Sequence, residues 1–281
     1  MSKTTIKKSS TKKVALFVGA LDLPFFTRDA LRKNGWQVYV VGLKGFYDPR
    51  LKPDLIIRLG GGGAAARECK KRGIKKLTFV GALGHPNLSD IWPDFWSLGA
   101  LITIMKNQKG YDSMAVAFTK ALEKKGFEVV AAQDLAPELT FEKSGIQTKT
   151  KPNAADKKDI DRAIEVSHTI GMADIGASVV VDKQVIAVEA AEGTHRMLER
   201  VIEFRKGRKK QTVSGVFAKM TKPGQDLRID IPAIGVDTVK SIAAAKLHGI
   251  VVNTKTCFVV NKPEVVKQAN KLGIFIIAVD E

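Results

Sequence analysis

The sequence predicts an α/β fold divided into two domains. Short apolar runs of strand length alternate along the chain with stretches of helical periodicity, which is typical of α/β architecture. The chain has 281 residues, of which 44% are hydrophobic, so it can bury two cores. Near the middle the periodic pattern gives way to polar residues with glycine and proline. We therefore expect a basic, disordered tail at 1–13, an N-terminal α/β domain at 14–134, a linker at 135–157 and a C-terminal α/β domain at 158–281.

The N-terminal half opens with a strand, a loop, a helix and a second strand. The apolar run 14–18 predicts the first strand, and Pro24 favours the start of a helix that ends at Asn34-Gly35. A second strand follows at 37–41. This order resembles the opening of nucleotide-binding domains, but the loop GALDLP has a single glycine and lacks the dinucleotide fingerprint.

A run of glycines, Gly60–Gly63, separates a third predicted strand at 54–59 from a helix that runs to Arg72. Bare backbone N–H groups before a helix can bind a phosphate. The alternative is a permissive turn with no ligand. No lysine, serine or threonine occupies the Walker position, so the sequence favours the turn.

The remaining elements follow from the same patterns. In the N-terminal half we expect a strand, two helices and a strand at 77–81, 88–105, 113–125 and 127–132. In the C-terminal half the apolar runs beside Asp182-Lys183 predict a hairpin of strands 177–181 and 184–189. Around it we expect helices at 158–170, 193–204, 237–247 (with Asp237 as N-cap) and 263–272, and strands at 212–219, 249–252, 257–260 and 274–279.

The stretch Lys219–Gly235, KMTKPGQDLRIDIPAIG, organises the C-terminal half. It starts with a turn at Pro223-Gly224. After the turn, charged and apolar residues alternate: Asp226, Arg228 and Asp230 against Leu227, Ile229 and Ile231. Such alternation predicts a half-buried strand with one apolar face and one face of charges. The charged face serves either a ligand or solvent alone.

The spacing of the two aspartates assigns them separate roles. On a straight strand the Cα atoms of Asp226 and Asp230 lie roughly 13 Å apart, too far for one metal ion to bind both side chains. Asp226 directly follows the turn, where a ligand can reach it. Asp230 lies deeper, next to Pro232, and we expect it to orient Arg228.

Composition excludes several kinds of site. The two cysteines are far apart and the four histidines lack ligand spacing, so we expect no zinc site, and the chain suits a reducing compartment. No Ser-His-Asp or Cys-His arrangement is visible, and no run of about 18 apolar residues could span a membrane. The net charge of +17 favours anionic partners, namely nucleic acid, phosphorylated small molecules or an acidic membrane surface.

Polar residues gather where predicted strands of the C-terminal half meet loops and helix N-termini. They are Asp174; Glu189, Glu192 and Thr194; and Lys219, Gln225, Asp226, Arg228 and Asp230. α/β sheets bind ligands at such positions. Carboxylates hold Mg²⁺ and cations stabilise phosphoryl charge, so this set suits phosphate chemistry. For Glu192 alone, the dipole of the following helix is an equally good explanation.

Three motifs, ADIGASVVV, AVEAAEGTHRML and KMTKPGQDLRIDIPAIGVDTV, closely resemble those of the LpxI-type UDP-2,3-diacylglucosamine diphosphatases. The resemblance extends from about the first strand to the last. It implies two α/β domains with a ligand cleft between them, the C-terminal domain being catalytic. The implied activity is Mg²⁺-dependent hydrolysis of the pyrophosphate of UDP-2,3-diacylglucosamine to UMP and lipid X (2,3-diacylglucosamine 1-phosphate). This reaction belongs to lipid A biosynthesis in the cytoplasm of Gram-negative bacteria.

The resemblance also implies residue roles. The essential aspartate of the family's GQD motif falls on Asp226, which we expect to ligate Mg²⁺ or to act as base toward the attacking water. Asp230 and Arg228 are the further catalytic candidates. The expected substrate-binding residues come from the first loop and the three motifs: Gly19, Leu23, Pro24, Glu189, Glu192, Gly193, Thr194, Lys219 and Gln225.

The chain departs from the family pattern at four positions. Leu21 and Lys246 replace glycines, Ala177 replaces the glutamine of the first motif, and His195 replaces the aspartate after EGT. The charged residues of the three motifs are retained, so we expect the chemistry to be kept and the substrate contacts to differ.

Two other functions remain open. One is a basic nucleotide- or nucleic-acid-binding protein without catalysis, and the other is an inactive homologue that scaffolds other lipid A enzymes. Few aromatic residues lie among the basic ones, so we expect no nucleic-acid partner. The positive charge favours peripheral association with the anionic inner-membrane surface, and a homodimer is a further candidate assembly.

Overall fold

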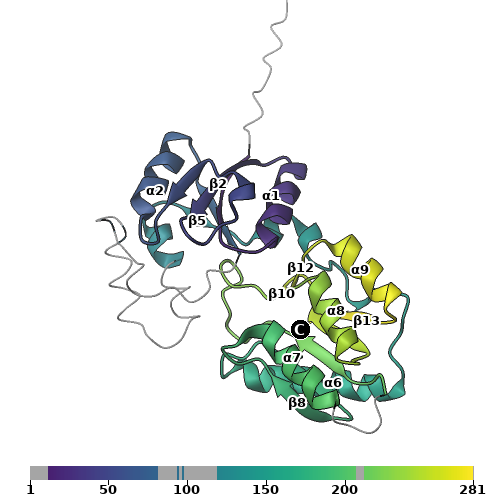
Figure 1. Ribbon diagram of the computed structural model, residues 1–281. Coiled ribbons are helices and arrows are strands. Elements are labelled where there is room, and N and C mark those ends of the chain that lie inside the picture. The colour runs from purple at the N-terminus through teal and green to yellow at the C-terminus, as the bar shows by residue number, and fades with distance from the viewer. Residues whose placement is uncertain (1–11, 82–93, 95–96, 98–118, 207–211, 281) are drawn as a thin grey trace, which may run out of the picture. The chain divides into compact units, whose positions relative to one another are not determined.

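The computed structural model describes residues 12–81, 94, 97, 119–206 and 212–280 (Figure 1). Within this part, the chain divides into two compact units between Leu135 and Ala136. Each unit combines a sheet with helices, so the prediction of two α/β domains is confirmed. The tail at 1–11, nearly all of the helix predicted at 88–105 and the first half of the one predicted at 113–125 lie outside the described residues.

The N-terminal unit contains a five-stranded parallel sheet. Its central strand β1 (Lys13–Val18) lies between β2 (Gln37–Leu43) and β4 (Lys76–Val80). β3 (Leu55–Ile57) pairs with β2, and β5 (Glu128–Val129) pairs with β4. The chain moves from β1 outward to β2 and β3 and then returns to place β4 on the other side. The switch point between β1 and β4 is where open α/β sheets bind ligands, at the carboxyl ends of the strands.

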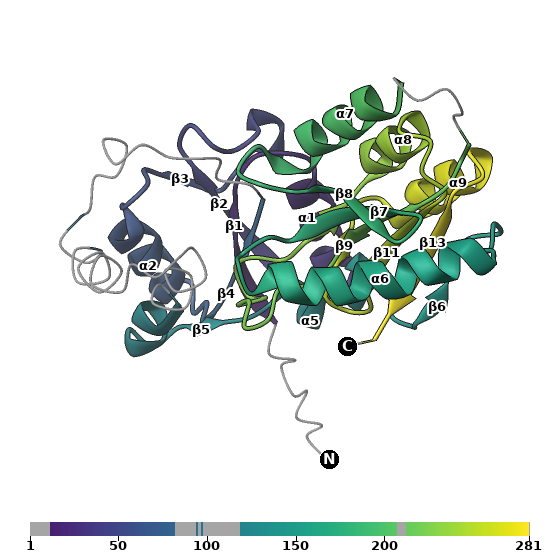
Figure 2. The same ribbon diagram turned by 90° about the horizontal axis from the view of Figure 1, so that it is seen from below.

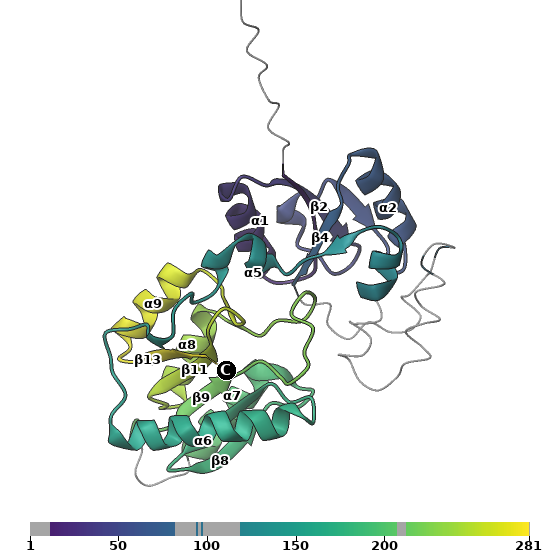
Figure 3. The same ribbon diagram turned by 180° about the vertical axis from the view of Figure 1, so that it is seen from behind.

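Helices cover both faces of this sheet. α2 (Gly62–Lys71) packs Ala66 and Cys69 against the face that includes Phe17. α1 (Leu23–Lys33) lies beside the short α5 (Ala132–Leu135), away from α2 (Figure 3). As predicted, α1 begins next to a proline and ends before a glycine. The strand predicted at 127–132 is shorter than expected because α5 begins at Ala132, and η1 (Pro49–Leu51) is a single additional turn.

The glycine run before α2 is capped from a distant segment. The N–H groups of Gly62 and Gly63 donate to Ser97 Oγ at 3.1 Å and to Asp94 Oδ2 at 2.8 Å. Ser97 N–H donates to Asp94 Oδ1 at 2.8 Å. Burial raises the pKa of Asp94, but the hydrogen bonds from Ser97 and Gly63 outweigh it, so this pKa lies below its usual value. The glycine run is therefore a turn, as the sequence favours. The Asp94 carboxylate occupies the position where the phosphate-binding interpretation would place a phosphate.

The C-terminal unit contains a mixed six-stranded sheet. Its strands follow the order β6 (Gly145–Ile146), β13 (Phe275–Val279), β11 (Gly249–Asn253), β9 (Val216–Lys219), β7 (Ala177–Val181) and β8 (Gln184–Val188). β13, β11 and β9 are parallel, whereas β6, β7 and β8 run antiparallel to their neighbours. The predicted hairpin is confirmed: Asp182 and Lys183 have φ of 49° and 64°, as a two-residue hairpin turn requires.

This sheet is the middle layer of three. α6 (Ala154–Gly171) covers one face, and α7 (Gly193–Lys206), α8 (Val236–Ala244) and α9 (Lys262–Lys271) cover the other (Figure 2). Strand alternation divides the core between the two faces. In β9, Val216 and Ala218 pack toward α6, while Phe217 packs with the other helices.

The stretch predicted as a linker contains structure of its own. Residues from Ala136 onward belong to the C-terminal unit, with η3 (Pro137–Leu139) followed by β6 at the edge of its sheet. α6 begins at Ala154 instead of Lys158 because Asn153 accepts hydrogen bonds from the N–H groups of the first turn.

Two smaller features complete the C-terminal unit. β10 (Ala233–Ile234) and β12 (Phe258–Val259) form a separate parallel pair. The prediction that Asp237 is the N-cap of α8 is wrong, because Gly235 holds that position and its N–H donates to Thr238 Oγ1 at 3.2 Å. No helix in the described part of the chain combines the length and apolar character needed to cross a bilayer.

Lys246 and Leu21 are among the residues whose backbone conformation favours glycine. Lys246 follows α8 with φ of 56°, and Leu21 follows β1 with φ of 73°. A side chain in the left-handed region costs roughly 1–2 kcal/mol. These are the two positions at which the sequence departs from a glycine of the resembled pattern, so the backbone keeps the conformation that the glycine would favour.

We expect Lys246→Gly to raise the free energy of unfolding by about 1 kcal/mol, because the strain at positive φ is removed. Urea denaturation followed by circular dichroism measures the change. The matched control is Lys240→Gly, in the exposed interior of α8, which should lower the free energy of unfolding by about 1 kcal/mol. Equal destabilisation by both substitutions would contradict the explanation.

We expect Asp94→Ala to lower the stability of the N-terminal unit by about 1 kcal/mol at neutral pH, since the first turn of α2 loses its carboxylate cap. The pKa of Asp94 is lowered in the folded state, so its contribution is present above the unfolded-state pKa of about 3.9 and is lost as the pH falls below that value and through the lower folded-state pKa. Urea denaturation at pH 7 and below pH 4 tests this. The exposed Asp29→Ala should change stability little at either pH.

Candidate functional site

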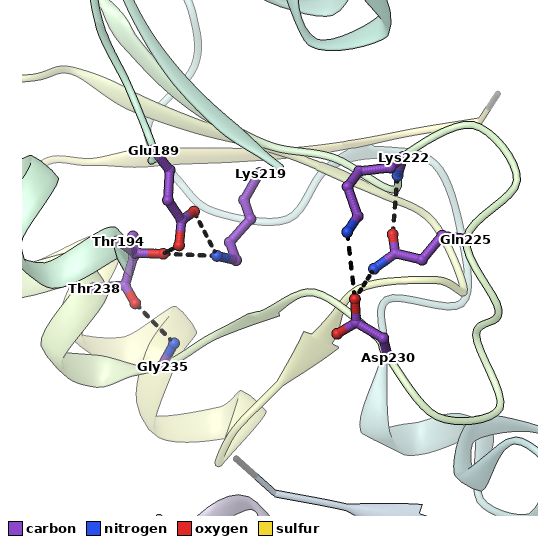
Figure 4. A network of polar contacts seen from close by, with 8 residues as sticks. All are labelled: Glu189, Thr194, Lys219, Lys222, Gln225, Asp230, Gly235 and Thr238. Carbon is purple, nitrogen blue, oxygen red and sulfur yellow. Dashed lines mark hydrogen bonds and ion pairs between the residues drawn. The ribbon is translucent and has the colours of Figure 1, made fainter. Parts of the chain in front are cut away.

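Three of the predicted substrate-binding residues meet at the carboxyl end of the C-terminal sheet. Glu189 follows β8, Thr194 lies in the first turn of α7 and Lys219 ends β9 (Figure 4). Lys219 Nζ donates to Glu189 Oε2 at 3.0 Å and to Thr194 Oγ1 at 2.6 Å, and Thr194 Oγ1 donates to Glu189 Oε1 at 2.9 Å. The two charged side chains are largely buried. The network therefore fixes an ammonium group where α/β sheets bind ligands.

Glu192 and Gly193 lie at the beginning of α7, beside this network. Glu192, directly before α7, forms an ion pair with Arg200 of that helix, and Arg200 also donates to the backbone oxygen of Val188 at 3.2 Å. A hydrogen bond from its own backbone N–H, and then the Arg200 guanidinium, hold the pKa of Glu192 below its usual value. The dipole of α7 and this ion pair both explain why a glutamate occupies position 192. A role for Glu192 in substrate binding therefore stays a prediction.

The prediction of a strand after Pro223-Gly224 is wrong. Residues 220–232, here called the Asp226 loop, form an irregular connection between β9 and β10. Gln225 N–H donates to the backbone oxygen of Lys222 at 3.1 Å, and Gly224 has φ of 78°, so the predicted Pro-Gly turn is present. The N–H groups of Ile229 and Asp230 then both donate to the backbone oxygen of Asp226 at 3.0 Å, which turns the chain back on itself.

Asp226 is the centre of this loop. Its side chain is only 6% exposed, and its Oδ1 accepts from the N–H and Nε of Arg228 at 3.1 and 2.8 Å. Its Oδ2 accepts from Nη2 of the same guanidinium at 2.7 Å. Arg228, at 34% exposure, is therefore presented to solvent by a buried carboxylate. Asp226 orients Arg228, and the prediction that Asp230 does so is wrong.

Asp230 belongs to a second set of contacts in the same loop. Gln225 Nε2 donates to Asp230 Oδ2 at 2.7 Å, and the N–H of Lys222 donates to Gln225 Oε1 at 2.9 Å (Figure 4). Lys222 Nζ forms ion pairs with Asp230, at 3.5 Å, and with Asp174 of the loop between α6 and β7. Lys222 is absent from the predicted site residues. Its position beside the Pro-Gly turn, inside the most specific motif, is the signal that could have found it.

Gly19, Leu23 and Pro24 belong to the N-terminal unit, whereas the residues described above belong to the C-terminal unit. Gly19 follows β1 at the switch point of the sheet, and its N–H donates to the backbone oxygen of Val80 at 2.9 Å. Pro24 is buried in the first turn of α1, and the backbone oxygen of Leu23 accepts from Thr27 Oγ1 at 3.0 Å. Leu23 and Pro24 form the start of α1, and the role of all three residues toward a substrate stays a prediction.

The described residues limit the kind of metal site. Among them, no group of three or more histidine, cysteine, aspartate or glutamate side chains surrounds a common point. Mg²⁺ commonly takes only one or two protein carboxylates and completes its shell with waters and substrate phosphates. The donor set fits such an ion, with Asp226 as the predicted ligand, but the carboxylate is already shared with Arg228.

The two thiols are buried, and two of the departures from the resembled pattern lie on β7 and α7. Burial raises the pKa of Cys69 to about 11 and that of Cys257 to about 12, so neither thiol is a nucleophile at neutral pH. Ala177 is buried at the start of β7, and the exposed His195 lies 3.4 Å from Glu199 on the outer side of α7. Ala177 lies opposite Lys219 in the pairing of β7 with β9, and its backbone oxygen accepts from the N–H of Glu189 at 2.9 Å, so the replacement at 177 lies beside the Lys219 network.

Comparison with known proteins covers both units. Residues 13–139 match the LpxI N-terminal domain, and residues 143–277 match the LpxI C-terminal domain. The chain is 34% identical over 276 residues to the UDP-2,3-diacylglucosamine pyrophosphatase LpxI of Caulobacter vibrioides, an alignment that covers 96% of this chain and 98% of that protein. The matched regions contain the Asp226 loop, the Lys219 network and the first loop of the N-terminal unit. The chain therefore belongs to the LpxI family.

Proposed function

We propose that this protein hydrolyses the pyrophosphate bond of UDP-2,3-diacylglucosamine to UMP and lipid X, a step of lipid A biosynthesis. The observation that carries the proposal is the buried Asp226 carboxylate held by Arg228 in a loop at the carboxyl end of β9. Family membership and the activity in the name of the Caulobacter relative support the same substrate. A paired acid and guanidinium also suit the hydrolysis of a phosphoric anhydride.

Arg228 receives the pyrophosphate. A guanidinium matches two phosphate oxygens with parallel hydrogen bonds, and the partial exposure of Arg228 leaves part of it in contact with solvent. Binding of an anion draws the guanidinium away from Asp226. The carboxylate is then available to accept a proton from the attacking water, within a loop that shields it from bulk solvent.

Mg²⁺ is the proposed cofactor. Asp226 and the phosphate oxygens of the substrate would hold it, and when bound it supplies screening of the negative charges that repel an attacking water. Asp230 lies in the same loop and keeps Gln225 and Lys222 in place. Its catalytic contribution is therefore proposed to be indirect.

Lys219 supplies a second cation for the phosphates. Glu189 and Thr194 fix its ammonium group at the end of β9, one residue before the Asp226 loop begins. Several other predicted substrate-binding residues lie at the starts of α7 and α1, and helix N-termini favour anionic groups. The net charge of +17 further supports peripheral association with an anionic membrane, where the lipid product is delivered.

We expect Asp226→Asn to reduce the release of UMP by at least about 100-fold, because the substituted amide cannot accept the proton. The assay uses purified protein and UDP-2,3-diacylglucosamine, with Mg²⁺ or with chelator. Asp237→Asn, an exposed acid in the first turn of α8, is the control and should retain full activity. Wild-type turnover in Asp226→Asn would exclude the proposed role. A folded wild-type protein that releases no UMP would favour the inactive-homologue alternative.

We expect Lys219→Met to lower kcat/KM roughly 10- to 100-fold, the cost of losing a charge-assisted contact to phosphate. The exposed Lys240→Met, in α8, is the matched control and should leave kcat/KM unchanged. If both variants behave like the wild type, Lys219 does not bind the substrate. Thermal denaturation shows whether the Lys219 variant is folded before its kinetics are interpreted.

A further inference from the structure

The ion pairs of Lys222 join the two loops that follow α6 and β9. We propose that Lys222 is a positioning residue, which together with Asp174 and Asp230 holds the Asp226 loop in the conformation that presents Asp226 and Arg228. The catalytic part of this inference rests on the proposed function. The conformational part concerns the loop itself and can be tested without a substrate.

The Asp226 loop depends on side-chain contacts for its shape. No strand ladder or helix stabilises residues 220–232. At one end, the N–H of Thr221 donates to Asn253 Oδ1 at 2.6 Å, and at the other the backbone oxygen of Pro232 accepts from the N–H of Phe258 at 2.8 Å. These bonds anchor the ends to β11 and β12. The conformation of the intervening residues must come from contacts within the loop and with its neighbours.

Lys222 closes a ring around the turn that contains Asp226. The backbone N–H of Lys222 donates to Gln225 Oε1, and Gln225 Nε2 donates to Asp230 Oδ2. Asp230 Oδ2 in turn forms an ion pair with Lys222 Nζ, which closes the ring (Figure 4). The ring brings residues 222 and 230 together, so the segment between them, with Asp226 and Arg228, is forced into a compact loop. The backbone bonds from Ile229 and Asp230 to Asp226 need the same compact shape.

Asp174 fixes this ring to the rest of the unit. It lies in the loop between α6 and β7, with φ of 64°, and forms an ion pair with Lys222 Nζ. Beside it, the loop packs closely on the end of α6: a Cβ at Gly171 would lie 2.7 Å from Cδ of Pro223. The N–H of Met220 also donates to the backbone oxygen of Gly176 at 3.2 Å. Lys222 thus connects the ring to a helix end that the core holds in place.

The exposure of the Lys222, Asp174 and Asp230 side chains indicates that their ion pairs position the Asp226 loop more than they stabilise the fold. The Lys222 side chain is 11% exposed, whereas those of Asp174 and Asp230 are 45% and 53% exposed. Removal of the ammonium group therefore leaves these two carboxylates in contact with solvent. Ion pairs with half-exposed partners contribute about 0–1 kcal/mol to stability. By contrast, a displacement of about 1 Å in a catalytic group can cost about 100-fold in rate.

The test compares Lys222→Met with Lys267→Met, an equal substitution in an exposed ion pair of α9. Hydrogen exchange of peptides covering 220–232 is measured without substrate, and kcat and KM are measured for UMP release. We expect faster exchange in this segment and a 10- to 100-fold lower kcat for Lys222→Met only, with KM changed by less than about threefold. Lys222→Arg, which can still pair with both carboxylates, should restore much of the protection and rate.

A second variant separates the ring from a general effect of lost charge. In an Asp174→Asn background, Lys222→Met should cause a smaller change than in the wild type, because one partner is already removed. Unchanged exchange at 220–232 in Lys222→Met would overturn the inference. A raised KM with unchanged kcat and exchange would also overturn it, and would make Lys222 a binding residue. If the wild type releases no UMP, the proposed function fails, while the exchange data still decide whether Lys222 holds the loop.

Discussion

A buried carboxylate needs a cation and hydrogen bonds nearby, and in this protein Arg228 supplies both for Asp226. Because the partner is only two residues further along the chain, the backbone must bend to bring guanidinium and N–H onto one carboxylate. The bend excludes the extended geometry of a strand. The position of the candidate catalytic carboxylate and the irregular shape of its loop therefore have the same cause.

The sheet positions one part of the site, and the Asp226 loop positions the other. β9 lies between β7 and β11 in the middle of the C-terminal sheet, so its carboxyl end is rigid, and it carries Lys219 to a fixed place beside Glu189 and Thr194. The chain then leaves the sheet, and the Asp226 loop takes its shape from side chains. A cation fixed at the strand end and a carboxylate–guanidinium pair presented by the loop suit a substrate whose charge develops during reaction.

Departures from the resembled pattern fall mainly on the backbone and the surface. Leu21 and Lys246 retain left-handed conformations that glycine would adopt without strain, so these replacements act on stability. His195 lies exposed on α7, and Ala177 is buried in β7. The charged contacts of Asp226, Lys219 and Lys222 involve none of these four residues. Ala177, however, lies opposite Lys219 in the sheet and accepts the backbone hydrogen bond of Glu189, so the replacement at 177 borders the proposed site.

Sequence periodicity by itself determined the two α/β units, the hairpin at Asp182-Lys183 and the bounds of α1, because these depend on residues close together along the chain. The motifs also singled out Asp226. Tertiary structure decided what each polar group meets. Asp94 caps Gly63 from 31 residues away, and Lys222 reaches Asp174 across 48 residues. Alternation after Pro223-Gly224 suggested a strand, but both edges of β9 are already paired, and the hydrogen bonds of Asp226 to its own loop favour a turn over a ladder.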